Sequence, residues 1–302
     1  MSVENKIKRV ANALVRRSYW FNTVAFPDCQ KFWRHNTFNV EVVNLGSSSG
    51  KHSFDYTGLD IKAANWAMAP QTLVCDLKIL ENYFSYLAKG AMVIIPLCPF
   101  SSLGGGNPYI PDKYYSILNP VSIPSFCIQK RNEVRTLRES PIRAFPLVAL
   151  VTEVKQCFKG SGNKAHGEEY YVESAKRAID SWMFEFSIKD LHAPLKLINQ
   201  DRMMLSAQVL NELVGFCKKK GLKPVLVFPP VSSYLATYFT ADVMDRFVYS
   251  FISMADVADV PFLNYLGSKD FTSDALFKDA YYLNAKGAKH FTQQVLKELK
   301  LI

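Results

Sequence analysis

The chain has 302 residues, of which 49% are hydrophobic and 21% are charged, so it can bury a substantial core. This composition excludes a globally disordered chain. The formal net charge is +9, but the lysines and arginines are dispersed and accompany no known nucleic-acid-binding motif. We therefore expect no nucleic-acid partner and interpret the charge as a solvated basic surface.

The N-terminal segment carries charges throughout and lacks the apolar stretch of a signal peptide. No window approaches the ~18 apolar residues of a membrane span. The six cysteines, at positions 29, 75, 98, 127, 157 and 217, include no CxxC pair and lie mostly in apolar runs, as reduced core cysteines do. We expect a cytoplasmic protein without a membrane span, a metal site or a cofactor.

Hydrophobic periodicity predicts alternating strands and helices along the chain. Residues 5–17 predict a basic amphipathic helix docked through its apolar side. A helix over 71–88 is expected to have Pro70 in its first turn and Lys89-Gly90 as its end. Further helices are predicted at 168–186, 201–220, 241–255 and 284–299, and strands at 40–45, 61–67, 91–97, 223–228 and 261–265.

This order, with short links, indicates a parallel sheet covered on both faces. The expected fold is α/β, a three-layer α/β/α sandwich with a central parallel sheet of flavodoxin-like type, over residues 39–302. Residues 99–165 are rich in glycine and proline and are expected to form one long insertion in that domain. Residues 1–38 are expected to form a basic extension packed on it.

The segment VNLGSSSGKHSFDY at 43–56 follows the first buried strand and allows two interpretations. A phosphate-binding loop needs four residues between its glycines and a hydroxyl residue after its lysine. Only three residues separate Gly46 from Gly50, and the residue after Lys51 is neither Ser nor Thr. The alternative is a nucleophilic serine, Ser48, at the carboxyl edge of the sheet, where backbone N–H groups can stabilise an oxyanion.

A second motif lies near the C-terminus. FKDAYYLNAKGAKHF at 277–291 places an aspartate ahead of Leu-Asn-x-x-Gly and a closing helix. Together with Gly46-x-Ser48 and VLVFPPVSSYL, this pattern resembles the SGNH (GDSL-like) hydrolase superfamily. The most similar branch comprises proteins of cell-envelope polysaccharide and D-alanyl-lipoteichoic acid assembly. The likeness covers residues 40–100 and 222–300.

The resemblance implies a serine nucleophile, a histidine base and an aspartate that orients the histidine. Carried over by position, Ser48 is the nucleophile and Asp279 the acid, but Tyr282 stands where the histidine is expected. A phenol, with a pKa of about 10, is a poor general base at neutral pH. His52, four residues after Ser48, could face the same cleft and replace the missing base.

The oxyanion donors that the resemblance implies are also altered. The family has a glycine where this chain has Pro70, which carries no N–H, and an asparagine where this chain has CPFSS. Asn65 or Asn107 could supply the missing amide. The residues expected to bind around Ser48 are Gly46, Ser49, Asn65 and Gln71.

Ordinary structural roles compete with these assignments, because Ser48 or Asn284 can cap a helix and Asp279 can cap a turn.

The sequence leaves two candidate functions open. The first is an SGNH-like esterase or acyltransferase, with an atypical triad, acting on an acylated sugar or surface-polysaccharide precursor; the substrate comes only from the resemblance. The alternative is a non-catalytic SGNH-like protein that binds a glycan or a partner enzyme of glycan assembly. The missing base and oxyanion glycine favour the alternative, whereas the retained Ser48 and Asp279 favour the first.

Overall fold

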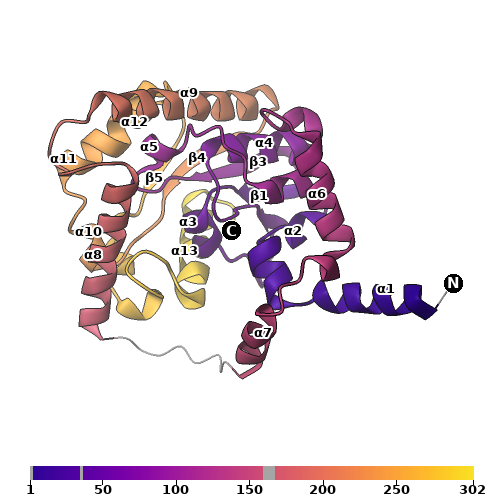
Figure 1. Ribbon diagram of the computed structural model, residues 1–302. Helices are drawn as coiled ribbons and strands as arrows, with labels where there is room; N and C mark the ends of the chain where they lie inside the picture. The colour runs from indigo at the N-terminus through magenta and orange to yellow at the C-terminus, as the bar shows by residue number, and fades with distance from the viewer. Residues whose placement is uncertain (1–2, 35–36, 159–166) are drawn as a thin grey trace. The chain divides into compact units, whose positions relative to one another are not determined.

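The computed structural model describes residues 3–34, 37–158 and 167–302 (Figure 1). Contacts between residues divide the chain into two compact units. Unit 1 combines Met1–Asn36 with Tyr109–Lys164, and unit 2 combines Thr37–Pro108 with Ala165–Ile302. Each unit is therefore built from two segments that lie far apart in the sequence.

Unit 2 contains a five-stranded sheet in the order β2-β1-β3-β4-β5, and every neighbouring pair is parallel. The predicted parallel sheet is confirmed, and the weaker strand expected at 61–67 is its edge strand β2. Near-continuous apolar runs form the three central strands because both of their faces are covered. The strands are β1 (Val40–Asn44), β2 (Ala63–Asn65), β3 (Leu87–Pro96), β4 (Lys223–Phe228) and β5 (Phe262–Asn264).

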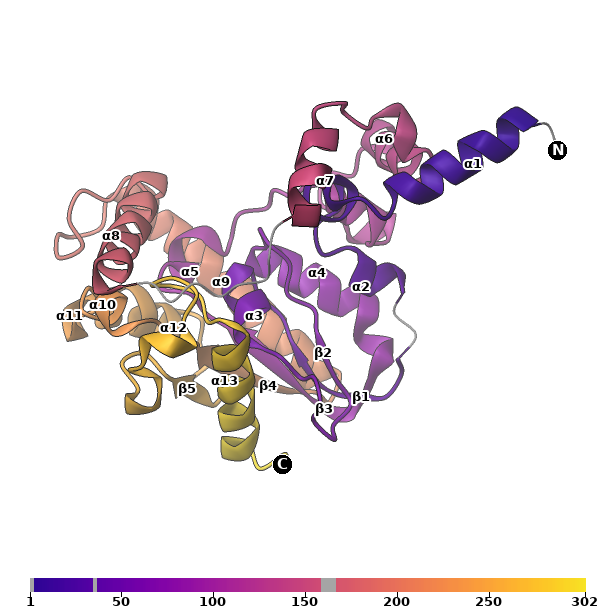
Figure 2. The ribbon, with the colours of Figure 1, turned by 90° about the horizontal axis from the view of Figure 1, so that it is seen from below.

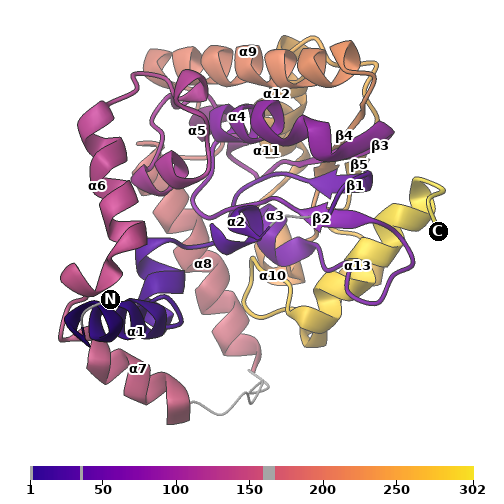
Figure 3. The same ribbon diagram turned by 90° about the vertical axis from the view of Figure 1, so that its right-hand side faces the viewer.

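Helices cover both faces of this sheet, which gives the expected three-layer α/β/α sandwich. Figure 3 shows α4 and α9 on one face and α13 on the other, and α8 lies beside α10 (Figure 2). The helices of unit 2 are α3 (Ser48–Ser53), α4 (Leu73–Tyr83), α5 (Ser101–Gly104), α8 (Glu168–Glu185), α9 (Leu197–Lys219), α10 (Ser233–Ala236), α11 (Ala241–Met244), α12 (Ser250–Met254) and α13 (Ala285–Glu298).

Two predicted boundaries around α4 are wrong. The helix begins at Leu73, after Thr72 accepts a hydrogen bond from Cys75 N, so Pro70 precedes its first turn. It ends at Tyr83, and Lys89-Gly90 lies inside β3 rather than at a helix end. The reason is that Leu87 already pairs with Val40 of β1, and this sheet contact outweighs the local helix-end signal.

The helix expected over 241–255 is present but contains a π-helical turn at Asp245–Tyr249.

The core on one side of the sheet is centred on Phe291 of α13, which is fully buried. Its ring lies 5.2 Å from that of Phe54, 5.0 Å from that of Tyr265 and 5.7 Å from that of Phe271, centroid to centroid. This aromatic packing fixes α13 against the sheet and next to α3. The last helix of the chain is thereby held beside the first helix after β1.

We expect Asn284→Ala to lower the free energy of unfolding by about 1–2 kcal/mol. The Asn284 side chain accepts a hydrogen bond from Gly287 N at 3.0 Å, which confirms the predicted N-cap of α13, and donates to Phe277 O at 3.2 Å. Urea denaturation of the variant measures the loss. Asn132→Ala, on an exposed part of α6, is the control and should change the unfolding free energy by less than about 0.5 kcal/mol. Equal effects of the two changes would contradict the capping role.

The described residues of unit 1 form helices, turns and irregular segments but no β-strand. Phe21, Phe26 and Trp33 pack together in its interior, with ring centroids 5.0–6.0 Å apart. The helices of unit 1 are α1 (Val3–Val15), α2 (Gln30–Trp33), α6 (Ile128–Glu139) and α7 (Ala149–Phe158), with short 3-10 or π turns at Phe21–Ala25, Asp112–Ser116, Pro120–Ser122 and Pro141–Arg143.

The apolar side of α1 differs from expectation. Ile7, Val10 and Leu14 are 60–63% exposed rather than docked, although Val15 is buried. The helix contacts the rest of unit 1 near its C-terminal end, where Asn12 accepts a hydrogen bond from Ile142 N. Across the described residues, no helix combines the length and the apolar character needed to cross a lipid bilayer.

Candidate functional site around Ser48

Ser48 is the first residue of α3, directly after the turn that follows β1. Gly46 begins this turn with φ at +105°, a conformation that side chains rarely adopt, and a Cβ there would lie 3.3 Å from the Pro96 ring. Only glycine therefore lets the chain turn this sharply beside β3. The turn leaves Ser48 at the carboxyl edge of the parallel sheet, where ligands bind in open α/β folds.

Asn65 does not reach Ser48. Its amide nitrogen donates to the carbonyl oxygens of Gly50, Lys51 and Phe54, at 3.4, 3.3 and 3.0 Å. Its side-chain oxygen accepts from Asn44 Nδ2 at 3.1 Å. These bonds tie α3 to the sheet, so the expectation that Asn65 donates to an oxyanion is not met. Asn107 is exposed and does not line the cavity that contains Ser48.

Tyr282 and Ser48 are in direct contact. The Tyr282 hydroxyl donates a hydrogen bond to Ser48 Oγ at 2.9 Å, so the two sequence motifs that contain these residues meet in the folded chain. Partial burial raises the pKa of Tyr282 above its ordinary value, and the bond with Ser48 only partly opposes this shift. The phenol therefore stays protonated at neutral pH. A protonated phenol is a poor acceptor for the proton of Ser48.

Asp279 positions the segment that carries Tyr282. One oxygen of its carboxylate accepts the backbone N–H of Tyr281 at 2.9 Å and that of Tyr282 at 2.8 Å. These bonds cap the turn and present the Tyr282 side chain to Ser48. Of the two roles considered for Asp279, triad acid and turn cap, these hydrogen bonds show the turn cap. Its catalytic role stays a prediction.

His52 lies next to the same tyrosine. Its ring centroid is 4.8 Å from that of Tyr282, and the two ring planes are tilted by 51°. His290, by contrast, is exposed on α13 and packs its ring against Phe271 at 5.1 Å. Of the three histidines that the structure describes, His52 is the one shown in contact with Tyr282.

A second hydroxyl network lies beside the first. Burial holds the pKa of Tyr281 well above its ordinary range, and Ser49 and Cys98 lie close enough to its hydroxyl to influence that pKa. Cys98 Sγ also accepts a hydrogen bond from Ser101 Oγ at 3.2 Å. Burial raises the pKa of the Cys98 thiol, which keeps it neutral. The sequence assigned Cys98 to the core, but it is half-buried and lines the cavity.

A buried carboxyl group, Asp76 on α4, supports the floor of the site. It is 2% exposed and accepts hydrogen bonds from Gly46 N at 2.7 Å and from the Gln71 side-chain amide. Burial raises the pKa of Asp76 to about 7, against the opposing effect of these two bonds. Gly46 and Gln71 were expected to bind ligand or an oxyanion, but their donors are engaged by Asp76.

The site opens into a cavity of about 490 Å³. One wall comes from α8, which contributes Ser181, Trp182 and Glu185, and Trp182 contacts Tyr281 edge-on at 4.9 Å. Among the described residues that line the cavity, three are carboxylic acids and none is lysine or arginine. Such a lining suits a neutral, hydroxyl-rich ligand better than an anion.

Among the described residues, no group of three or more His, Cys, Asp or Glu residues is placed to hold a metal ion.

The sequence did not identify Asp76 or the residues of α8 as part of the site. Asp76 carried one signal, a carboxylate within the apolar helical stretch LVCDLKIL, since an acidic residue is rarely buried without a partner. Trp182 and its neighbours carried none, because α8 lies more than 100 residues from Ser48 in the sequence. Only the folded chain brings α8 to the cavity.

No family model matches the chain, and no curated protein matches its sequence. Among the solved structures that match the chain are the two that follow. One is a protein from Streptococcus pneumonia described as a candidate platelet activating factor, 8% identical, with 99% of each chain covered and a TM-score of 0.43. The other is YxiM from Bacillus subtilis, 13% identical, with 87% of this chain and 57% of that chain covered and a TM-score of 0.41. Neither likeness is close enough to transfer a function, so function has to be argued from the site.

Proposed function

We propose that unit 2 is an SGNH-like protein whose Ser48 cavity binds an acylated carbohydrate, and that Ser48 hydrolyses esters slowly or not at all. The observation that carries this proposal is the hydrogen bond that Tyr282 donates to Ser48 Oγ at 2.9 Å. An efficient serine nucleophile needs a neighbour that accepts its proton, and a protonated phenol does not.

The oxyanion side of the site supports the same conclusion. A tetrahedral intermediate needs donors 2.7–3.1 Å from its oxyanion, and losing one donor typically lowers the rate by about 10²–10³-fold. Here Gly46 N and the Gln71 amide point to Asp76, and Pro70 has no N–H. The position of the base is thus held by a protonated phenol, and two of the expected donors are bound to Asp76.

The chemistry of the cavity supports a neutral carbohydrate ligand. Hydroxyl and carboxyl groups from Ser48, Ser181 and Glu185 can exchange hydrogen bonds with sugar hydroxyls, and Trp182 offers an apolar surface. The acyl group and the glycan come from the resemblance to SGNH proteins of the cell envelope.

A second candidate function is an active esterase or acyltransferase in which His52 acts as the base. The packing of the His52 ring against Tyr282 favours it, because this contact places an imidazole beside the residue that is hydrogen-bonded to Ser48. Imidazole, with an ordinary pKa near 6.5, is suited to accept the serine proton at neutral pH.

Hydrolysis of p-nitrophenyl acetate separates the two candidates. We expect the unmodified protein to have a kcat/KM within about tenfold of that of Ser48→Ala, because catalysis by an unactivated serine is weak. Brisk hydrolysis that Ser48→Ala abolishes would contradict the proposal. If His52→Ala abolished it as well, while His290→Ala did not, the second candidate would be correct.

Ligand binding is tested separately, by isothermal titration with an O-acetylated oligosaccharide and its deacetylated counterpart. We expect the acetylated form to bind and Trp182→Ala to weaken that binding by at least about tenfold, the usual effect of removing a central aromatic contact. Trp20→Ala, in unit 1, is the matched control and should leave it unchanged. Binding that is absent, or unaffected by Trp182→Ala, would contradict a carbohydrate site in this cavity.

A further inference from the structure

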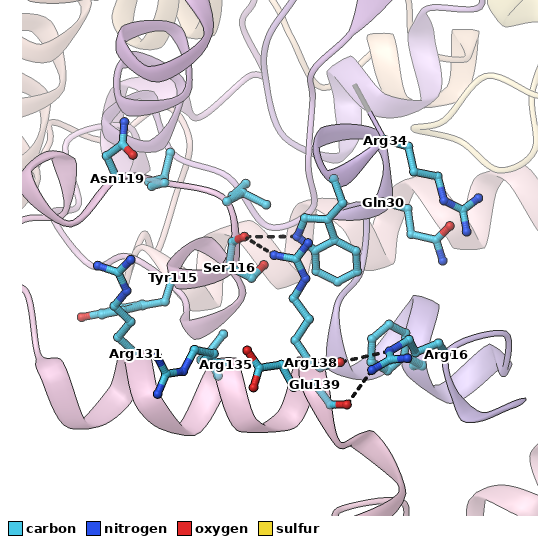
Figure 4. Close-up of a pocket in the computed structure, with 15 residues that line it drawn as sticks. Arg16, Gln30, Arg34, Tyr115, Ser116, Asn119, Arg131, Arg135, Arg138 and Glu139 are labelled. Atoms are coloured by element: carbon cyan, nitrogen blue, oxygen red, sulfur yellow. Dashed lines mark hydrogen bonds between the residues drawn. The ribbon is translucent and has the colours of Figure 1, made fainter. Parts of the chain in front are cut away.

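Unit 1 contains its own cavity, of about 790 Å³, lined entirely by residues of that unit (Figure 4). Five arginines line it, against a single carboxylate, Glu139. The arginines come from three places in the chain: Arg16 follows α1, Arg34 follows α2, and Arg131, Arg135 and Arg138 belong to α6. This lining is opposite in charge to that of the Ser48 cavity.

The fold, rather than a run of basic sequence, gathers these arginines. Arg131, Arg135 and Arg138 recur at helical spacing, which places them along one side of α6. Figure 4 shows Arg131 beside Tyr115 at one end of the cavity and Arg34 beside Gln30 at the other. Positive charge therefore lies at both ends of one cavity.

Two of the five arginines hold the wall of the cavity together. The Arg138 guanidinium lies over the Trp33 ring, 4.3 Å from its centroid, and donates to Ser116 O at 3.3 Å. Arg16 donates to Arg138 O at 3.2 Å and to Glu139 O at 2.5 Å. In Figure 4, no hydrogen bond joins Arg34, Arg131 or Arg135 to the other residues drawn. These three guanidinium groups can therefore serve a ligand.

The electrostatics favour an anion. Like charges around one cavity repel each other, and a bound anion relieves that repulsion. The planar guanidinium matches phosphate in a two-point hydrogen-bonded geometry, and such charge-assisted bonds are among the strongest in proteins. The volume is that of a site for a small organic molecule, larger than one phosphate ion requires.

We propose that this cavity binds a small molecule that carries two or more phosphate groups. Arg131 and Arg135 engage one end of the anion and Arg34 the other. Tyr115 and Asn119, which also line the cavity, contact the remainder of the molecule. This site is separate from the Ser48 cavity, and the proposal does not depend on the function proposed for that cavity.

Isothermal titration of the full chain with inorganic pyrophosphate, triphosphate and phosphate tests the proposal. We expect pyrophosphate and triphosphate to bind at least about tenfold more tightly than phosphate, because a second charged group adds its own hydrogen bonds. The double change Arg131→Gln with Arg135→Gln should weaken pyrophosphate binding by at least about tenfold. Arg34→Gln, at the other end, should weaken pyrophosphate less than triphosphate.

The matched control removes the same charge outside the cavity. Arg9 and Arg143 are exposed residues of unit 1 that do not line it, so Arg9→Gln with Arg143→Gln should change affinity by less than about threefold. Equal losses in the two double variants would overturn the proposal by showing a diffuse effect of net charge. The absence of pyrophosphate binding would overturn it too. A third result would also overturn it: tight binding of a single-stranded oligonucleotide that pyrophosphate does not displace. If the double change Arg131→Gln with Arg135→Gln abolished that binding, the site would be one for nucleic acid.

Discussion

Tyr282→His is expected to raise the kcat/KM for p-nitrophenyl acetate by about tenfold to a hundredfold. The segment capped by Asp279 already presents residue 282 to Ser48, at 2.9 Å in the unmodified protein. An imidazole there accepts the serine proton, and a positioned general base contributes about 10²–10⁴-fold to such reactions. The gain should fall below this range because Gly46 N and the Gln71 amide still point to Asp76.

Tyr282→Phe is the matched control, since it removes the hydroxyl without supplying a base. We expect it to leave hydrolysis near the unmodified level, and Ser48→Ala combined with Tyr282→His to abolish the gain. An equal rise in Tyr282→Phe and Tyr282→His would show that the phenol only restrains Ser48. No rise in either would contradict the assignment of position 282 as the place of the base.

Asp76→Asn is expected to remove a fall in stability between about pH 4 and pH 7. Burial raises the pKa of Asp76 from 3.8 to about 7. Between these values the folded protein keeps a proton that the unfolded chain has released, so the contribution of Asp76 to stability decreases as the pH rises. A shift of this size corresponds to roughly 4 kcal/mol at most, fully lost above about pH 7. Asparagine carries no charge and can still accept the Gly46 N–H.

Urea denaturation at pH 5 and pH 8 measures this difference. We expect Asp76→Asn to be more stable at pH 8, relative to pH 5, than the unmodified protein by a few kcal/mol. Asp60→Asn, at an exposed position, should reproduce the pH dependence of the unmodified protein. If Asp76→Asn did so as well, the buried carboxyl group would not be the source of the effect.

The central sheet could be predicted from the sequence because its strands are buried on both faces. Val40–Asn44 has valine at three of its five positions, Lys223–Phe228 is apolar after its first residue, and no helical spacing competes with either run. The start of β3 could not be predicted, because Lys89-Gly90 carries the local signature of a helix end. The pairing of Leu87 with Val40 decides that boundary, and pairing between strands is not visible in a local window.

The candidate site could be predicted only at the two sequence motifs, where each functional residue has characteristic neighbours in the sequence. The turn at Gly46 and the segment at Tyr282 have characteristic neighbours, and their contact follows from the topology. The topology does not determine which partner each hydrogen-bonding side chain binds. Asn65 and Gln71 are both amides near the turn, yet one binds the backbone of α3 and the other binds Asp76. Spacing cannot distinguish these outcomes, because each depends on distances between side chains in the folded protein.

The interleaved composition of the two units has a consequence for synthesis on the ribosome. Residues 1–36 are made before 37–108, but the segment with which they form unit 1, 109–164, is made only afterwards. At about 5–20 residues per second, the first segment waits on the order of ten seconds for its partner. During that time its apolar residues, including Phe21 and Phe26, have no core to enter. We therefore expect chaperones to bind this segment of the nascent chain until residues 109–164 have emerged. A truncation at residue 36 would remove 36 of the 92 residues of unit 1 rather than a tail.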